Sequence, residues 1–176
     1  VDGATSTALL GNYLSELNLN YEIYIPDRKK EGYGPSIKSF KELIDKGVKL
    51  IFTVDCGTLS FKAINFAKES NIDVIVLDHH QSEVKLPEAF SIINPNRFDD
   101  NSDLKYLCAA GVAFIFLVSL NRELRKKDWF LQNEIKEPNL INYLDLVTLG
   151  TICDVVPLKG LNRAFVKQGL KIIKSK

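Results

Sequence analysis

Residues 50–80 read LIFTVDCGTLSFKAINFAKESNIDVIVLDHH and combine two apolar runs with a helical pattern between them. The runs Leu50 to Val54 and Asp73 to Leu77 are rich in β-branched residues, as buried strands are. Between the runs, four apolar residues recur at helical spacing: Leu59, Ala63, Ile64 and Ala67. A strand, a helix and a second strand of these lengths predict a right-handed βαβ unit with a parallel pair of strands.

The same alternation extends in both directions. Tyr21 to Ile25 and Phe90 to Ile93 are further strand candidates. Two upstream segments place apolar residues on one helical face: Leu9, Leu10, Tyr13, Leu14 and Leu17, then Ile37, Phe40, Leu43 and Ile44.

After Asn96 the pattern becomes mostly helical. Helices are predicted over Gly111 to Arg125, Leu140 to Leu149 and Asn162 to Lys174, and a polar loop over Asp99 to Lys105. The predicted fold class is therefore α/β: a parallel-sheet domain with helices on both faces, followed by a mostly helical segment.

Composition limits the class of protein. The 176 residues fit one domain, and 23 basic against 22 acidic residues exclude a histone-like polycation while permitting a local basic groove. The apolar run Leu107 to Leu120 is shorter than the roughly 18 to 20 residues of a membrane span, which predicts a core helix and no membrane association. Three widely spaced cysteines, Cys56, Cys108 and Cys153, predict reduced thiols in a cytoplasmic protein.

Acidic residues occupy the predicted ends of strands. Asp55 follows the strand that ends at Val54, and Asp78 follows the strand that ends at Leu77. Asp2 opens a helix from Thr5 onward, whose preceding strand would lie upstream of Val1. Ligands of open parallel sheets bind beyond the carboxyl ends of the strands, so we expect these carboxylates at one edge of the sheet.

Each acidic residue also has a simpler interpretation. Asp2 and Asp55 are residue types that cap a following helix, and Asp154 could be an ordinary turn residue. Asp78-His79-His80 is more specific, because the only two histidines of the chain are adjacent to each other and to a carboxylate. Imidazole with carboxylate suits ions such as Mn²⁺, so we predict a metal or phosphate site in which two divalent ions would activate a phosphoryl group.

A basic loop adds a candidate substrate contact. Arg28, Lys29 and Lys30 precede the sequence Gly32-Tyr33-Gly34-Pro35. The loop could be a solvated turn, since glycine and proline favour turns. It could also bind DNA phosphates through Arg28, with Tyr33 available to stack on a base.

Several strings resemble the motifs of the DHH phosphoesterase superfamily in the order of that family. VDGATSTALL resembles the end of the first motif, TVDCG the second, LDHHQ the Asp-His-His signature and GTICDVVPL the fourth motif. The stretches IPDRKKEGYGPS, AAGVAFIF and LNRAFVKQGL resemble the RecJ family of exonucleases. The resemblance covers essentially all of residues 1–176.

The resemblance implies a role for each matching residue. Asp55 would bridge two ions, Mn²⁺ or Mg²⁺, and three residues would complete the shell of the second ion: Asp2, His79 and Asp154. His80 would face the scissile phosphate, and Asp78 would orient a histidine. Asn94 and Arg163 resemble positions near the substrate.

The implied function is a metal-dependent exonuclease specific for single-stranded DNA, which works 5′ to 3′, releases 5′-mononucleotides and acts in recombination and repair. The alternatives are a DHH phosphoesterase acting on oligoribonucleotides, cyclic dinucleotides or pyrophosphate, and a non-catalytic replication scaffold. By this resemblance, the first two acids of motif one, with their strand, would precede Val1, and we expect residues 1–176 to lack the DHHA1-type domain of the family. We therefore expect residues 1–176 to be a truncated DHH domain that is weakly active or inactive alone.

Overall fold

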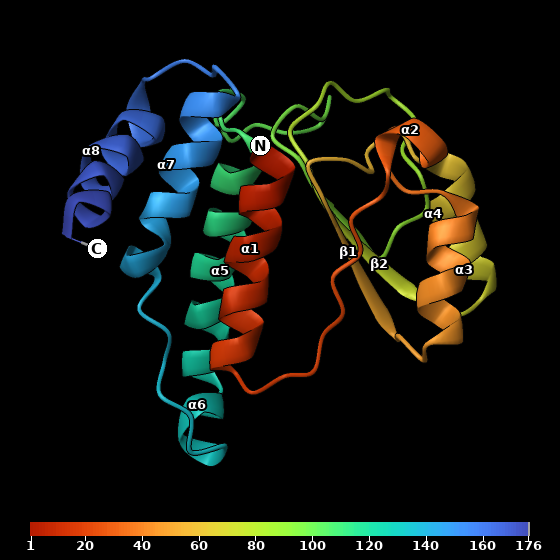
Figure 1. The fold of residues 1–176 in the computed structure, drawn as a ribbon, viewed down its shortest axis with the longest axis horizontal. Coiled ribbons are helices and arrows are strands. Elements are labelled where there is room, and N and C mark those ends of the chain that lie inside the picture. The colour runs from red at the N-terminus through yellow and green to blue at the C-terminus, as the bar shows by residue number, and fades with distance from the viewer. Residues whose placement is uncertain (176) are drawn as a thin grey trace. The chain divides into compact units, whose positions relative to one another are not determined.

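A computed structural model describes residues 1–175. The chain forms two compact units (Figure 1). The sheet unit is the continuous segment Tyr24–Lys105. The helical unit combines Val1–Ile23 with the chain from Tyr106 onward. The predicted change from alternating strands and helices to mostly helix after Asn96 therefore falls close to the boundary between the two units.

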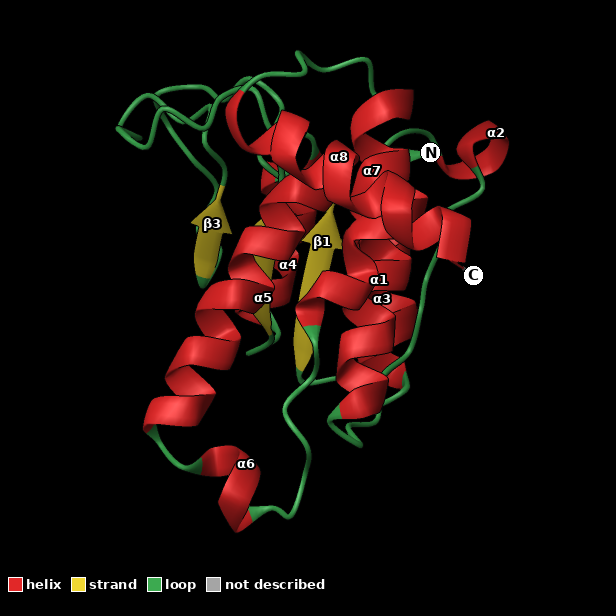
Figure 2. Cartoon of the chain, turned by 90° about the vertical axis from the view of Figure 1, so that its left-hand side faces the viewer, coloured by secondary structure: helices red, strands yellow, loops and turns green. Residues whose placement is uncertain are grey.

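Three parallel strands form the sheet unit's core. They are β1 (Leu50–Val54), β2 (Asp73–Leu77) and β3 (Ser91–Ile93), in the order β1-β2-β3. Figure 2 shows the strands as yellow arrows. The last residue of β2, Leu77, is in register with the last residues of both neighbouring strands, so all three strands end at one edge. The parallel sheet predicted from residues 50–80 is confirmed.

Helices of the sheet unit are α2 (Arg28–Glu31), α3 (Ile37–Asp45) and α4 (Phe61–Glu69). A capping box between Ser36 and Ser39 starts α3, because each side chain accepts a hydrogen bond from the backbone N–H of the other residue. Helix α4 packs on β2, and α3 packs against α4. The core between them is apolar and nearly inaccessible, with these members among others: Phe40, Ile64, Ala67, Val74 and Val76. Each large side chain buried there stabilises the unit by about 1.5–3 kcal/mol.

The helical unit is built from a bundle whose elements come from both ends of the chain. Its elements are α1 (Asp2–Glu16), α5 (Ala109–Lys126), α6 (Trp129–Gln132), a 3₁₀ turn η1 (Leu140–Tyr143), α7 (Leu144–Cys153) and α8 (Gly160–Ser175). Helices α1, α5 and α7 pack against one another, and α8 packs against α7. The run Leu107 to Leu120 supplies the buried face of α5, as predicted for a core helix. Within residues 1–175, no helix has both the length and the apolarity to cross a bilayer.

Two predictions about elements are wrong. Tyr21 to Ile25 forms no strand, and Tyr21, Ile23 and Ile25 are substantially exposed. A strand needs a hydrogen-bonded neighbour, and within residues 1–175 this segment pairs with none of the three strands. Leu59 precedes α4 rather than lying on its buried face, and 49% of its surface is exposed.

Candidate metal centre

The ends of β1 and β2 hold two aspartates in fixed positions. The backbone N–H of Asp55 donates to the Leu77 carbonyl (3.0 Å), and that of Asp78 donates to the Ile93 carbonyl (3.1 Å). The hydrogen-bond ladder thus continues one residue past each strand. Asp55 adopts the left-handed conformation (φ 59°), which aspartate and asparagine tolerate better than most residues.

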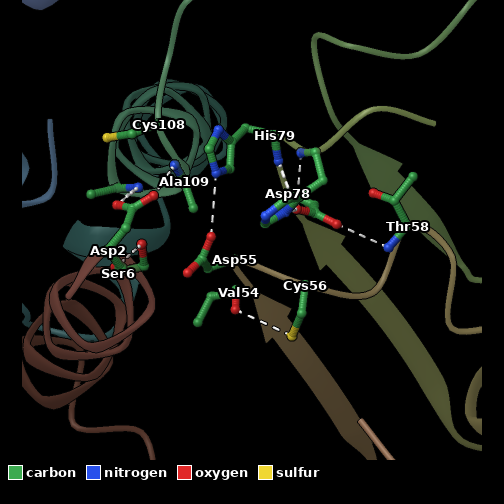
Figure 3. Close-up of polar contacts among 12 residues, drawn as sticks. Asp2, Ser6, Val54, Asp55, Cys56, Thr58, Asp78, His79, Cys108 and Ala109 are labelled. Atoms are coloured by element: carbon green, nitrogen blue, oxygen red, sulfur yellow. Dashed lines mark hydrogen bonds and ion pairs between the residues drawn. The ribbon is translucent and has the colours of Figure 1, made fainter. Parts of the chain in front are cut away.

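Asp78 organises the histidine pair through its buried carboxylate (Figure 3). One oxygen, Oδ1, accepts hydrogen bonds from the backbone N–H groups of His79 (2.8 Å) and His80 (3.2 Å) and lies 2.7 Å from His80 Nδ1. The other oxygen accepts from the Thr58 N–H (3.0 Å). Burial alone would raise the pKa of Asp78, but the hydrogen bonds from Thr58 and His80 outweigh it and lower that pKa. Asp78 is therefore ionised, and Nδ1 of His80 carries the shared proton.

The loop after β1 depends on a glycine to deliver the Thr58 N–H. Gly57 has φ 116°, a conformation that side chains rarely adopt. A Cβ atom there would also clash with Thr53 Oγ1. Any larger residue would shift the turn and move Thr58 away from Asp78.

His79 turns toward Asp55. The distance from His79 Nε2 to Asp55 Oδ1 is 3.3 Å, and both side chains are largely buried. Potential ligand atoms of Asp55, His79 and His80 all lie within 4.8 Å of one another. Carboxylate and imidazole donors at this spacing fit a divalent transition-metal ion. The capping interpretation of Asp55 is wrong, because the N-cap of α4 is Ser60.

Asp2 lies in the first turn of α1, whose N-cap is Val1, so it does not cap its own helix. Its two carboxylate oxygens instead accept hydrogen bonds from Ala109 N (2.6 Å) and Ala110 N (3.0 Å), at the start of α5 (Figure 3). These are two of the backbone donors that a helix leaves unpaired at its N-terminus, where the helix dipole also favours an anion. Asp2 therefore caps a helix that begins 107 residues later.

Asp154 is the C-cap of α7, so the turn position expected from the sequence is correct. A carboxylate oxygen of Asp154 and one of Asp2 lie within 4.8 Å of each other. Gly150 of α7 permits this approach, because a Cβ atom there would lie 2.7 Å from Asp2 Oδ1. The helical unit thus brings together both acidic residues predicted in it.

Tyr33 contacts the histidine site from the basic loop. Its hydroxyl donates to the Asp55 carbonyl (2.7 Å) and lies 3.3 Å from His80 Nε2. The Arg28 guanidinium lies over the Tyr33 ring, 5.2 Å from its centroid, in a cation–π arrangement. Burial, followed by the charge of Asp55, raises the pKa of Tyr33, so its hydroxyl remains a proton donor.

The nearby thiols are neutral. Burial, then the charges of Asp78 and Asp55, raises the pKa of Cys56 to about 12. Burial and the charge of Asp2 likewise raise the pKa of Cys108 to about 12. Metal coordination by cysteine requires the thiolate, so these residues are poor ligands beside the carboxylates.

The remaining substrate candidates occupy different environments. Asn94 is buried, and its side-chain amide donates to Thr58 Oγ1 (2.9 Å) and to the His80 carbonyl (2.8 Å). Arg163 is exposed on α8, with Nε 3.3 Å from the Leu158 carbonyl. Thr58 and Asn96 were not among the residues predicted from the sequence, although Thr58 contacts Asp78 and Asn96 contacts His79. A tight Cys-Gly-Thr turn after β1 and the Asn-Pro-Asn string after β3 were the available signals.

Comparison with known proteins places this geometry in a family. The chain is 43% identical over 175 residues to the single-stranded-DNA-specific exonuclease RecJ of Salmonella typhimurium and 42% identical to that of Escherichia coli, covering 99% of this chain in each case. It spans 30% of the length of each of these relatives. A crystal structure of exonuclease RecJ bound to manganese matches with a TM-score of 0.82 at 34% identity, covering 99% of this chain and 41% of that one.

A family model gives the broader assignment. The model of the DHH family, N-terminal domain, matches residues 1–151, which include both histidines and the strand-end aspartates. The DHH resemblance drawn from VDGATSTALL, TVDCG and LDHHQ is thereby confirmed. The chain belongs to the DHH family.

Proposed function

We propose that this chain is the DHH segment of a metal-dependent exonuclease that degrades single-stranded DNA. In this proposal it works 5′ to 3′, releases 5′-mononucleotides and serves recombination and repair in the cytoplasm. The observation that carries the proposal is the cluster of Asp55, His79 and His80, whose potential ligand atoms lie within 4.8 Å of one another. The names of relatives at 42–43% identity support the choice of DNA as substrate.

The proposed metal ligands are Asp2, Asp55, His79 and Asp154, with Asp55 shared by two ions. Mn²⁺ and Mg²⁺ are the proposed cofactors, which agrees with the manganese in the matched RecJ structure. Carboxylates must be ionised and imidazole neutral to bind a metal ion, so we expect affinity to fall in acid. When bound, the ions would supply Lewis-acid activation of water and neutralise charge on the phosphoryl group.

His80 is the proposed contact to the scissile phosphate. Its Nδ1 is held by the Asp78 carboxylate at 2.7 Å, which fixes the orientation of the ring. Nearly half of the His80 side chain is exposed, so Nε2 can reach a substrate. With the ring in the imidazolium form, Nε2 would donate a hydrogen bond to a phosphate oxygen and stabilise the charge that builds up in the transition state.

The proposal is tested with the full-length protein, because this chain spans 30% of the length of its RecJ relatives. End-labelled single-stranded DNA, duplex DNA, a dinucleotide and pyrophosphate are incubated with Mn²⁺ and, separately, with EDTA. We expect stepwise loss of nucleotides from the single strand, beginning at its 5′ end, and none in EDTA. Addition of excess Mn²⁺ should restore the activity.

Other results would identify a different function. Cleavage of the dinucleotide or pyrophosphate alone would retain the phosphoesterase chemistry and replace the DNA substrate. No cleavage of any substrate, together with binding to DNA, would favour a non-catalytic scaffold.

Arg28, Tyr33 and Arg163 are proposed substrate contacts. The cation–π pair places the Arg28 charge and the Tyr33 ring beside the histidine site. Arg163 belongs to a segment without acidic residues, 155–175, whose exposed basic side chains along α8 are Arg163, Lys167, Lys171 and Lys174. A chain of phosphates is the ligand that such a surface attracts.

Arg28→Ala is expected to weaken binding of single-stranded DNA about tenfold, since one charge-assisted hydrogen bond to phosphate is lost. The slope of log affinity against log salt should become shallower by about 0.7, the value for one phosphate on a single strand. Fluorescence anisotropy over a salt series measures both quantities. Lys41→Ala removes an exposed charge from α3 and serves as control. Equal slopes for Arg28→Ala and wild type would exclude Arg28 as a phosphate contact.

A further inference from the structure

The two histidines lie on an irregular loop, yet all four of their backbone polar groups are hydrogen-bonded. Asp78 Oδ1 accepts from both N–H groups. The His79 carbonyl accepts from Asn96 Nδ2 (2.6 Å), and the His80 carbonyl accepts from Asn94 Nδ2 (2.8 Å). The strand ladder that would satisfy these carbonyls has already ended, so two side-chain amides replace it.

The orientation of both amides is determined by their partners. Asn94 Oδ1 accepts from the Asn96 backbone N–H (2.8 Å), which leaves Nδ2 to face the His80 carbonyl and Thr58 Oγ1. Asn96 Nδ2 also lies 3.3 Å from the Lys105 carbonyl. Two carbonyls can only accept, so this atom is the nitrogen.

Pro95 stiffens the link between the two asparagines. Its ring fixes one backbone torsion, and it restricts Asn94 to extended conformations. The bond from Asn96 N–H to Asn94 Oδ1 closes an Asx turn over the same three residues. Asn94 and Asn96 therefore form one rigid unit that directly follows β3 and is anchored beside β2.

We propose that Asn94 and Asn96 are positioning residues that hold the backbone of His79 and His80 in the orientation required for metal and phosphate binding. This inference rests on the proposed function, because it assigns the histidines their metal and phosphate roles. A peptide group that lost its amide partner could rotate, and rotation would swing the attached imidazole away from Asp55 or Asp78. Asn94 then acts through His80, and its buried amide is occupied by protein rather than by substrate.

Asn96→Asp tests the proposal with nearly unchanged shape. Both donor contacts of Asn96 would become repulsive contacts between oxygens. We expect the dissociation constant for Mn²⁺, measured by titration calorimetry on the metal-free full-length protein, to rise by at least about tenfold. The rate of DNA cleavage at saturating Mn²⁺ should fall as well, because His80 is displaced together with His79.

Asn121→Asp is the control, because the side-chain amide of Asn121 also donates to a backbone carbonyl, that of Pro138 (3.1 Å), although Asn121 is more deeply buried than Asn96. It lies in the C-terminal half of α5, about 18 Å along the helix from Ala109. We expect Asn121→Asp to lower the melting temperature and leave Mn²⁺ affinity within twofold of wild type. Should Asn96→Asp fail to fold, Asn96→Ala, which admits water to the carbonyls, is measured in its place, with at least a threefold loss expected.

The possible results separate this inference from the proposed function. Unchanged Mn²⁺ affinity in a folded Asn96 variant, or an equal loss in Asn121→Asp, would overturn the positioning role. Weakened Mn²⁺ binding in a protein whose wild type does not cleave DNA would support the positioning role and refute the exonuclease. Absence of Mn²⁺ binding by the wild type would overturn both.

Discussion

Asp55→Asn is expected to reduce the rate of single-strand cleavage by about 10³-fold, since the loss of several kcal/mol of metal-dependent stabilisation corresponds to this factor. The neutral amide binds metal ions weakly and cannot be shared by two of them. The fold should persist, because the backbone bonds of Asp55 to Leu77 and Tyr33 do not involve its carboxylate. Asparagine also tolerates the left-handed backbone at this position. Initial rates over a Mn²⁺ series measure the effect.

Asp103→Asn is the control for this substitution. Asp103 is exposed and has φ 56°, close to the 59° of Asp55, so the change in charge and the demand on the backbone are the same. We expect activity within twofold of wild type. A loss of less than tenfold in Asp55→Asn would show that its carboxylate is not a metal ligand.

Asp78→Asn is expected to lower the free energy of unfolding of the metal-free protein by about 3–5 kcal/mol, because a buried ionic hydrogen-bond hub is broken. In either orientation, the new NH₂ group faces a donor. It meets the Thr58 N–H on one side or the histidine N–H groups on the other. The rate of DNA cleavage by the folded variant should also fall 10–100-fold relative to wild type, since the His80 ring loses the carboxylate that orients it. Urea unfolding at neutral pH measures the stability.

Asp73→Asn, at the exposed start of β2, provides the comparison, because Asp78 directly follows the other end of this strand. We expect a change of less than about 0.5 kcal/mol, as is usual for surface substitutions. Equal unfolding midpoints for Asp78→Asn and Asp73→Asn would contradict the hub role of Asp78.

Local sequence patterns predicted the sheet well. Strands β1 and β2 and the helix between them follow from hydrophobic periodicity, which acts through near neighbours. Asp55 and Asp78 were then placed correctly at one edge, because parallel strands end together. The strand predicted over Tyr21 to Ile25 does not form. The composition of this segment suits a strand, but strand formation also requires a neighbouring strand, which composition does not reveal.

Contacts between residues that are distant in the sequence could not be predicted from it. Asp2 is of a residue type that is favoured at helix N-termini and does cap a helix, but the helix is α5 rather than α1. The Tyr33 hydroxyl meets Asp55 across 22 residues, and Asn96 meets His79 across 17. A single sequence gives no information on which of many distant residues is the contact partner of a given residue. The residue types indicated which side chains belong to the site, whereas their contact partners could be identified only from the structure.

The division of the helical unit between the two ends of the chain has a consequence for biosynthesis. The sheet unit is one continuous segment, so its strand pairings are complete once Lys105 has left the ribosome. Helix α1 is synthesised before its partners α5 and α7 and can pack against them only after they have been made, a delay on the order of ten seconds at ordinary elongation rates. During that interval the apolar face of α1 is exposed to nascent-chain chaperones, and the Asp2 carboxylate lacks the N–H donors of Ala109 and Ala110 until α5 has been synthesised.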